Sequence, residues 1–201
     1  MPQEFSLYQY DSHEEYKNAQ AEGNKRKISS VWALEKNIKH LSKILKKREP
    51  KFGICHGTRR GVEQSWFRKY LGCEVIGTEI SDTAEQFPHT IEWDFHEVKP
   101  EWLGNVDFIY SNSFDHSYDP EKCLNAWMSC LSSNGVCILE HTSLHSEDGV
   151  SRTDPFGASL EVMPELIEKW GAGKYRVADI KKTPKKHKFV KYSSFIFIEN
   201  Q

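Results

Sequence analysis

Residues 52–61 read FGICHGTRRG, and residues 74–79 read EVIGTE. The first stretch predicts a buried strand that runs into a glycine-bearing turn, and the second predicts a strand that ends on Glu79. Such a turn before a helix, followed about 20 residues later by an acid, is typical of α/β folds that bind a nucleoside-containing cofactor. The turn presents backbone amides to an anionic group, and the acid accepts hydrogen bonds from ribose hydroxyls. These two stretches make cofactor chemistry the leading hypothesis.

The turn alone is a weak match to this pattern. Arg59 stands where a second glycine is expected, and Cys55 stands where an acid often occurs. An ordinary tight turn between a strand and a helix explains this stretch equally well, so the hypothesis depends on the rest of the chain.

Composition limits the class of protein. A chain of 201 residues fits one α/β domain, and its formal net charge of −2 argues against nucleic acid as a general partner. Its apolar runs are shorter than the roughly 20 residues of a membrane span. Residues 1–11 lack the order of a signal peptide. We therefore expect a cytoplasmic protein without a membrane partner, and the oligomeric state is left open.

The five cysteines are an odd number and include no Cys-x-x-Cys pair. This usage predicts neither a disulfide scaffold nor a zinc site, and it fits a reducing compartment. Cys123 and Cys130 lie seven apart on a predicted helix, and Cys137 lies in a predicted strand. We expect all three to be small buried core residues.

Residues 12–21 and 29–47 show helical periodicity before the first strand. For the apolar stripe of the second helix, packing on the sheet is the favoured interpretation, and capping of the ligand cleft is the alternative. Pro50 marks a boundary, which predicts an N-terminal helical extension over residues 1–50 and a cofactor-binding domain over residues 51–201. The apolar stripe of the second helix comprises Val31, Leu34, Ile38, Leu41 and Leu45.

Beyond this boundary, strands and helices alternate, which predicts a parallel sheet with helical crossovers. Residues 175–180 and 193–199 read as two strands joined without a helix, which predicts an antiparallel pair. The fold class expected is α/β, with a Rossmann-like, mostly parallel seven-stranded sheet, an antiparallel C-terminal strand and helices on both faces. The other predicted strands are 52–56, 74–79, 90–94, 106–111 and 135–140, and the helices are 62–71 and 120–132.

Five motifs in order resemble the small single-domain class I S-adenosylmethionine-dependent methyltransferases, over roughly residues 51–199. They are HGTRRG (56–61), TEIS (78–81), EWDF (92–95), VDFIYSNSFDH (106–116) and NGVCILEH (134–141).

The resemblance implies S-adenosyl-L-methionine as the cofactor. Glu79 would bind the ribose hydroxyls, Asp94 would meet the adenine amino group, and the turn would lie under the methionine moiety. We expect Arg59 or Arg60 to pair with the cofactor's carboxylate, the alternative being that both point to solvent. The cofactor-binding residues implied are Gly57, Thr58, Arg59, Arg60, Gly61, Glu79, Ile80, Asp94, Phe95, Ser111 and Asn112.

Methyl transfer from a sulfonium requires positioning, and it requires a base only when the acceptor is a weak nucleophile such as a hydroxyl. His116 and His141 follow predicted strands and are the candidate catalytic bases, with a structural role as the alternative for each. Residues 141–160 are polar and irregular, which suggests a substrate lid. His145, Glu147 and Asp148 are too loosely spaced to predict a metal site.

The acceptor expected is a small molecule or a sugar, methylated at oxygen, because the chain shows no added domain for a polymer. Residues 111–114 read SNSF, not the Asn-Pro-Pro-Tyr or Asp-Pro-Pro-Tyr associated with methylation of amino groups. Two alternatives remain. One is a non-catalytic cofactor-binding or partner-binding protein of the same fold, and the other is an NAD(P)-dependent oxidoreductase.

Overall fold

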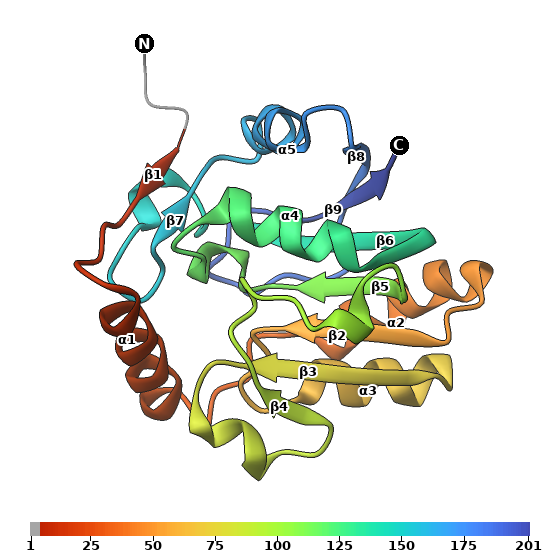
Figure 1. The fold of residues 1–201 in the computed structure, drawn as a ribbon, viewed down its shortest axis with the longest axis horizontal. Coiled ribbons are helices and arrows are strands. Elements are labelled where there is room, and N and C mark those ends of the chain that lie inside the picture. Colours follow the sequence, from red (N-terminus) through yellow and green to blue (C-terminus); the bar gives the residue numbers. More distant parts are fainter. Residues whose placement is uncertain (1–4) are drawn as a thin grey trace.

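The computed structural model describes residues 5–201, so residues 1–4 of the predicted extension lie outside the described residues. A seven-stranded sheet of order β4-β3-β2-β5-β6-β9-β8 forms its centre (Figure 1). Its strands are β2 (Phe52–His56), β3 (Glu74–Glu79), β4 (Thr90–Glu92), β5 (Val106–Ser111), β6 (Leu131–Thr142), β8 (Tyr175–Lys182) and β9 (Ser193–Asn200). A separate two-stranded sheet pairs β1 (Ser6–Leu7) with β7 (Phe156–Gly157).

Strands β4, β3, β2, β5 and β6 are mutually parallel. Strand β9 is antiparallel to both of its neighbours, β6 and β8, so β8 runs in the same direction as the parallel set. The predicted fold class is therefore confirmed, including the antiparallel pairing of the last two strands.

Residues 5–201 form five α-helices, and two hydrophobic clusters show which face of the sheet four of them cover. Helices α2 and α3 bury side chains against one face, and α4 and α5 bury theirs against the other. The helices are α1 (His13–Arg26), α2 (Glu35–Leu45), α3 (Val62–Leu71), α4 (Pro120–Cys130) and α5 (Met163–Gly171). None of the helices within residues 5–201 is long and apolar enough to cross a membrane.

Capping chemistry explains where two crossover helices begin. The Asp119 carboxylate accepts a hydrogen bond from the Lys122 amide, and Pro120 occupies the first turn of α4, as the sequence predicted. Helix α3 begins after Gly61, whose φ of 68° lies in the left-handed region. Both helices therefore start directly after the loops that follow β5 and β2.

Several predicted bounds are wrong. The helix predicted over 12–21 continues to Arg26, and the strand predicted over 135–140 begins at Leu131. Strand 90–94 ends at Glu92, because the Asp94 carboxylate accepts a hydrogen bond from the His96 amide and turns the chain away from the sheet. The helix predicted over 29–47 begins only at Glu35, and Val31 is exposed in the loop before it. The stripe residues within α2, by contrast, are buried, and so are Cys123, Cys130 and Cys137, as predicted.

Trp127 of α4 contacts two segments at the carboxyl ends of the parallel strands. Its ring stacks on His56 at 4.6 Å between centroids, and its indole Nε1 donates a hydrogen bond of 2.7 Å to the Phe95 carbonyl. Burial lowers the pKa of His56 to about 3, so its imidazole is neutral. The Trp127 side chain therefore supports both the end of β2 and the segment after β4.

We expect Trp127→Ala to destabilise the domain by about 3–5 kcal/mol, because it leaves a cavity under His56 and an unpaired Phe95 carbonyl. Urea unfolding at neutral pH measures this change. The matched control is Leu103→Ala, which removes an apolar side chain that is 51% exposed and should change stability by less than about 0.5 kcal/mol. Equal effects for the two variants would contradict the supporting role of Trp127.

Candidate functional site

The turn after β2 is fixed by backbone hydrogen bonds to β3. The amides of Gly57 and Thr58 both donate to the Thr78 carbonyl, at 2.9 and 3.1 Å. Gly57 has a φ of 70°, and a Cβ at this position would lie 2.7 Å from the Cβ of Ser113. Only glycine therefore allows the turn to pack this closely against the loop after β5.

Glu79 ends β3 next to this turn and is only 7% exposed. Its carboxylate accepts hydrogen bonds from the amides of Arg59, at 3.0 Å, and Ser81, at 3.2 Å. Burial raises the pKa of Glu79 above its usual value, and the two amides partly oppose this effect. The carboxylate lines a cavity of about 50 Å³, together with Gly57, Ile80 and Phe95. We call this the inner cavity.

Helix α1 covers the inner cavity from outside the sheet. Figure 1 shows α1 beyond the edge toward which the arrows of β2, β3 and β5 point, and Tyr16, Gln20 and Asn24 of α1 line the cavity. The Oδ1 atom of Asn24 accepts a hydrogen bond from Thr83, at 2.9 Å. Its buried Nδ2 completes no hydrogen bond within the described residues, although it lies near enough to the Glu79 carboxylate to help lower the pKa of that group.

Asp94 has both carboxylate oxygens engaged. One accepts a hydrogen bond from the His96 amide at 2.9 Å, and the other lies 2.7 Å from Nε2 of His13 in α1. Burial acts to raise the pKa of Asp94, but the hydrogen bonds and charge of His96, with the contact from His13, hold it below its usual value. The next residue, Phe95, lines the inner cavity.

Ser111, the last residue of β5, and Asn112, the residue after it, have different surroundings. Ser111 is buried and donates its hydroxyl to the His56 carbonyl at 3.0 Å, so it joins two strand ends. Asn112 lies beside Glu63 of α3, and burial raises the pKa of this glutamate to about 7. Asn112 and Ser113 both line a second cavity of about 490 Å³, which we call the outer cavity.

The outer cavity is continuous with the inner one, because Lys27, Arg59, Ser113 and His116 line both. Its volume lies within the range of ligand pockets. Segment 141–160, predicted as a lid, contributes wall residues between β6 and β7. Those residues are Leu144, His145, Gly149 and Asp154.

The side chains of the two arginines in the turn reach the chain between α1 and α2. Arg59 donates to the Ser30 carbonyl at 3.3 Å, and Arg60 donates to the Ser29 carbonyl at 3.1 Å. Arg59 lines both cavities, whereas the Arg60 guanidinium also lies over the Phe87 ring. Arg59 is therefore the arginine that reaches the cavities.

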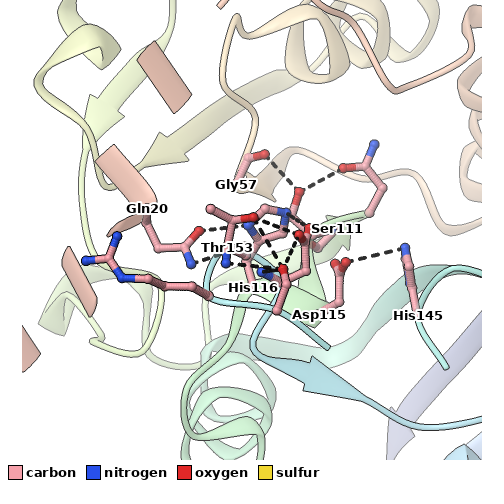
Figure 2. Close-up of polar contacts among 12 residues, drawn as sticks. Gln20, Gly57, Ser111, Asp115, His116, His145 and Thr153 are labelled. Atoms are coloured by element: carbon pink, nitrogen blue, oxygen red, sulfur yellow. Dashed lines mark hydrogen bonds and ion pairs between the residues drawn. The ribbon is translucent and has the colours of Figure 1, made fainter. Parts of the chain in front are cut away.

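The two candidate bases occupy different environments. His116, in the short helix η4 (Phe114–His116), lines both cavities, and its Nδ1 lies 2.8 Å from Oε1 of Gln20 (Figure 2). His141 is buried, and its Nε2 lies 3.0 Å from the Ala158 carbonyl. Burial lowers the pKa of His141 to about 3, and His141 lines a separate cavity of about 10 Å³.

Sequence reasoning missed several cavity residues. Gln20 and Asn24 of α1 and Asp154 of the segment after β6 lie far in sequence from the strand ends that they face. Asp115 stood inside a quoted motif, next to His116, but its acidic side chain was given no role. For the residues of α1, the signal in the sequence was the polar character of one side of the helix. A helix that faces solvent has the same character.

No protein-family model and no curated protein sequence matches this chain. Among solved structures, the 1,6-didemethyltoxoflavin-N1-methyltransferase of Burkholderia thailandensis is similar, with a TM-score of 0.70 and 13% identity over 96% of this chain and 92% of that one. That structure holds 1,6-didemethyltoxoflavin and S-adenosylhomocysteine.

Two further structures are similar. The TehB-like S-adenosylmethionine-dependent methyltransferase of Corynebacterium glutamicum gives a TM-score of 0.58 at 13% identity, covering 92% of this chain and 98% of that one. An S-adenosylmethionine-dependent methyltransferase of Aquifex aeolicus gives 0.55 at 15%, covering 83% and 98%. At these identities the similarity is one of fold. The chain therefore has the fold of the class I S-adenosylmethionine-dependent methyltransferases.

Proposed function

We propose that this protein is an S-adenosylmethionine-dependent methyltransferase that acts on a small molecule or a sugar, at an oxygen atom. The observation that carries the proposal is the position of Glu79 and the glycine turn at the inner cavity, directly beside an outer cavity of about 490 Å³. The fold supports the cofactor. The volume of the outer cavity supports a small acceptor, as does the small molecule bound in the Burkholderia enzyme.

In this proposal the adenosine part of the cofactor occupies the inner cavity. Glu79 accepts hydrogen bonds from the ribose hydroxyls, Phe95 packs against the adenine, and the unused Nδ2 of Asn24 donates to the nucleoside. Asp94 can meet the adenine amino group only when its contact with His13 is released. The cofactor residues Gly57, Thr58, Arg59, Arg60, Gly61, Ile80, Ser111 and Asn112 remain proposed as the sequence suggested.

Cofactor binding requires movement of α1. The inner cavity of about 50 Å³ has room for one or two waters, since a water occupies about 30 Å³. Tyr16, Gln20 and Asn24 line the cavity from α1 and must shift to admit a nucleoside. In this proposal α1 covers the bound cofactor, whereas the apolar stripe of α2 packs on the sheet, as the sequence analysis favoured.

Methyl transfer would occur where the two cavities meet, at Ser113, with Asn112 on the side of the outer cavity. The displacement neutralises the sulfonium, so positioning of the two reactants supplies much of the rate. Of the two candidate histidines, His116 is the one that lines this junction. We assign to it the role of the base that acts on an acceptor hydroxyl. The five unpaired cysteines support a reducing compartment, and cytoplasmic localisation is part of the proposal.

The first test is calorimetric titration of the full chain with S-adenosylhomocysteine. We expect saturable binding that Glu79→Ala weakens by about 1.5–3 kcal/mol, or about 10- to 150-fold, because charge-assisted hydrogen bonds to the ribose are lost. Glu85→Ala is the matched control, since Glu85 is an exposed acid in the turn after β3. Binding of NADH in place of S-adenosylhomocysteine would support the oxidoreductase alternative and contradict the proposal.

The second test measures methyl transfer from labelled S-adenosylmethionine to a panel of phenols, catechols and sugars. With an active acceptor, we expect His116→Gln to lower the rate by about 100-fold or more. His141→Gln should leave the rate nearly unchanged, and both variants should retain affinity for S-adenosylhomocysteine. Equal losses for the two variants would contradict the assignment to His116. Cofactor binding without transfer to any acceptor would favour the non-catalytic alternative.

A further inference from the structure

Three side chains with metal-ligand atoms meet at the wall of the outer cavity. Asp115 and His116 belong to η4, directly after β5, and Asp154 belongs to the segment between β6 and β7. One carboxylate oxygen of each aspartate and one ring nitrogen of the histidine lie within 4.8 Å of one another. Nitrogen and oxygen ligands of this kind suit divalent transition metals.

The distances from His116 to Asp154 and from His145 to Asp115 are too long for direct hydrogen bonds. Nε2 of His116 lies 3.6 Å from Oδ1 of Asp154, and Nε2 of His145 lies 3.7 Å from Oδ2 of Asp115. Hydrogen bonds between nitrogen and oxygen measure about 2.7–3.2 Å. Two ligand atoms about 2.1 Å from one tetrahedral ion lie about 3.4 Å apart. The separation of His116 and Asp154 therefore resembles that of two ligands on either side of one cation.

Gln20 determines which nitrogen of His116 carries a proton. The Gln20 amide Nε2 donates to the Thr153 carbonyl at 3.2 Å, and a carbonyl can only accept. This orientation directs the Oε1 atom of Gln20 at Nδ1 of His116, at 2.8 Å, so Nδ1 must donate. In a neutral imidazole, Nε2 then presents a lone pair to the Asp154 carboxylate. Metal-binding histidines have the same arrangement, with the second nitrogen donating to an oxygen.

The two carboxylates are also arranged as ligands. Oδ2 of Asp154 accepts hydrogen bonds from Ser151 and Thr153, at 2.9 and 2.8 Å, which leaves Oδ1 directed at His116. Asp115 is 8% exposed, and its Oδ1 is buried without a hydrogen-bond partner anywhere in residues 5–201. Figure 2 shows Asp115 with its contact to His145 and the polar contacts around His116. Unpaired buried carboxylate oxygen is costly unless a positive charge is present.

We propose that Asp115, His116 and Asp154 bind a divalent transition-metal cation, such as Zn²⁺ or Mn²⁺, at the wall of the outer cavity. Gln20, Ser151 and Thr153 are the positioning residues that orient these ligands. The sequence analysis predicted no metal site, because Asp154 reaches the other two only through the fold. Lys27 also lines this cavity and brings a competing positive charge, so its removal should tighten cation binding.

In this proposal His116 acts as a metal ligand and not as a free base. A cation held by these residues would take an acceptor oxygen as a further ligand and lower the pKa of its hydroxyl, so that the hydroxyl would release its proton to solvent before methyl transfer. That role rests on the proposed methyl transfer. The cation site itself does not, because metal binding is measured without cofactor or acceptor.

The experiment titrates the chelator-treated full chain with Zn²⁺ by calorimetry and with Mn²⁺ by electron paramagnetic resonance. We expect one site per chain, weakened more than about 100-fold in His116→Gln and Asp154→Asn, and about 10- to 100-fold in Gln20→Leu. The matched control, Asp148→Asn, changes an exposed acid of the same segment and should retain full affinity. Mg²⁺, which prefers oxygen ligands, should bind weakly.

Circular dichroism and S-adenosylhomocysteine titration on the same samples separate a folding defect or a failed cofactor proposal from a failed cation site. Asp115→Asn serves as the second variant if Asp154→Asn does not fold. The absence of saturable Zn²⁺ and Mn²⁺ binding would overturn the proposal. So would binding that is unchanged in the folded ligand variants, or Mg²⁺ binding as tight as that of Zn²⁺.

Discussion

The site depends on the two hydrogen bonds by which the turn after β2 is held to the Thr78 carbonyl of β3. They place the Arg59 amide on the Glu79 carboxylate and bring Gly57 against the loop after β5. A side chain at Gly57 would separate these segments. Contacts of the backbone therefore fix the turn and the loop beside the two cavities, and side chains such as Arg59 and Ser113 take their positions from that backbone.

Sequence patterns predicted the centre of the sheet well, because each central strand is a short apolar run bounded by turn residues. The ranges 52–56, 74–79 and 106–111 agree with the structure residue for residue. The misplaced bounds lie where a tertiary contact competes with local pattern. Arg59 and Arg60 bind the carbonyls of Ser30 and Ser29, and these bonds hold residues before α2 in a loop despite their apolar spacing.

The sequence predicted the parts of the candidate site whose residues lie close together along the chain. It did not predict the parts that bring together residues far apart in sequence. Glu79 and the turn are separated by one helix, so order along the sequence placed them together. Asn24 lines the inner cavity and Asp154 lines the outer one, from segments that precede and follow the central strands in sequence, and only the three-dimensional fold brings them to these adjoining cavities. His116 follows β5 as predicted, but His141 lies within β6, which continues to Thr142, and is buried there. No local pattern in the sequence reports burial of that kind.

Gln20 belongs to both cavities at once, because it lines the inner one and fixes the ring of His116, which lines the outer one. Any ligand that displaces α1 to enter the inner cavity also releases His116 from that constraint. In the proposed function, occupation of the inner cavity would therefore change the free energy of binding in the outer one. Thermodynamic linkage makes this effect equal in both directions. The two halves of the cleft are in that sense a cooperative pair, joined by a single amide side chain.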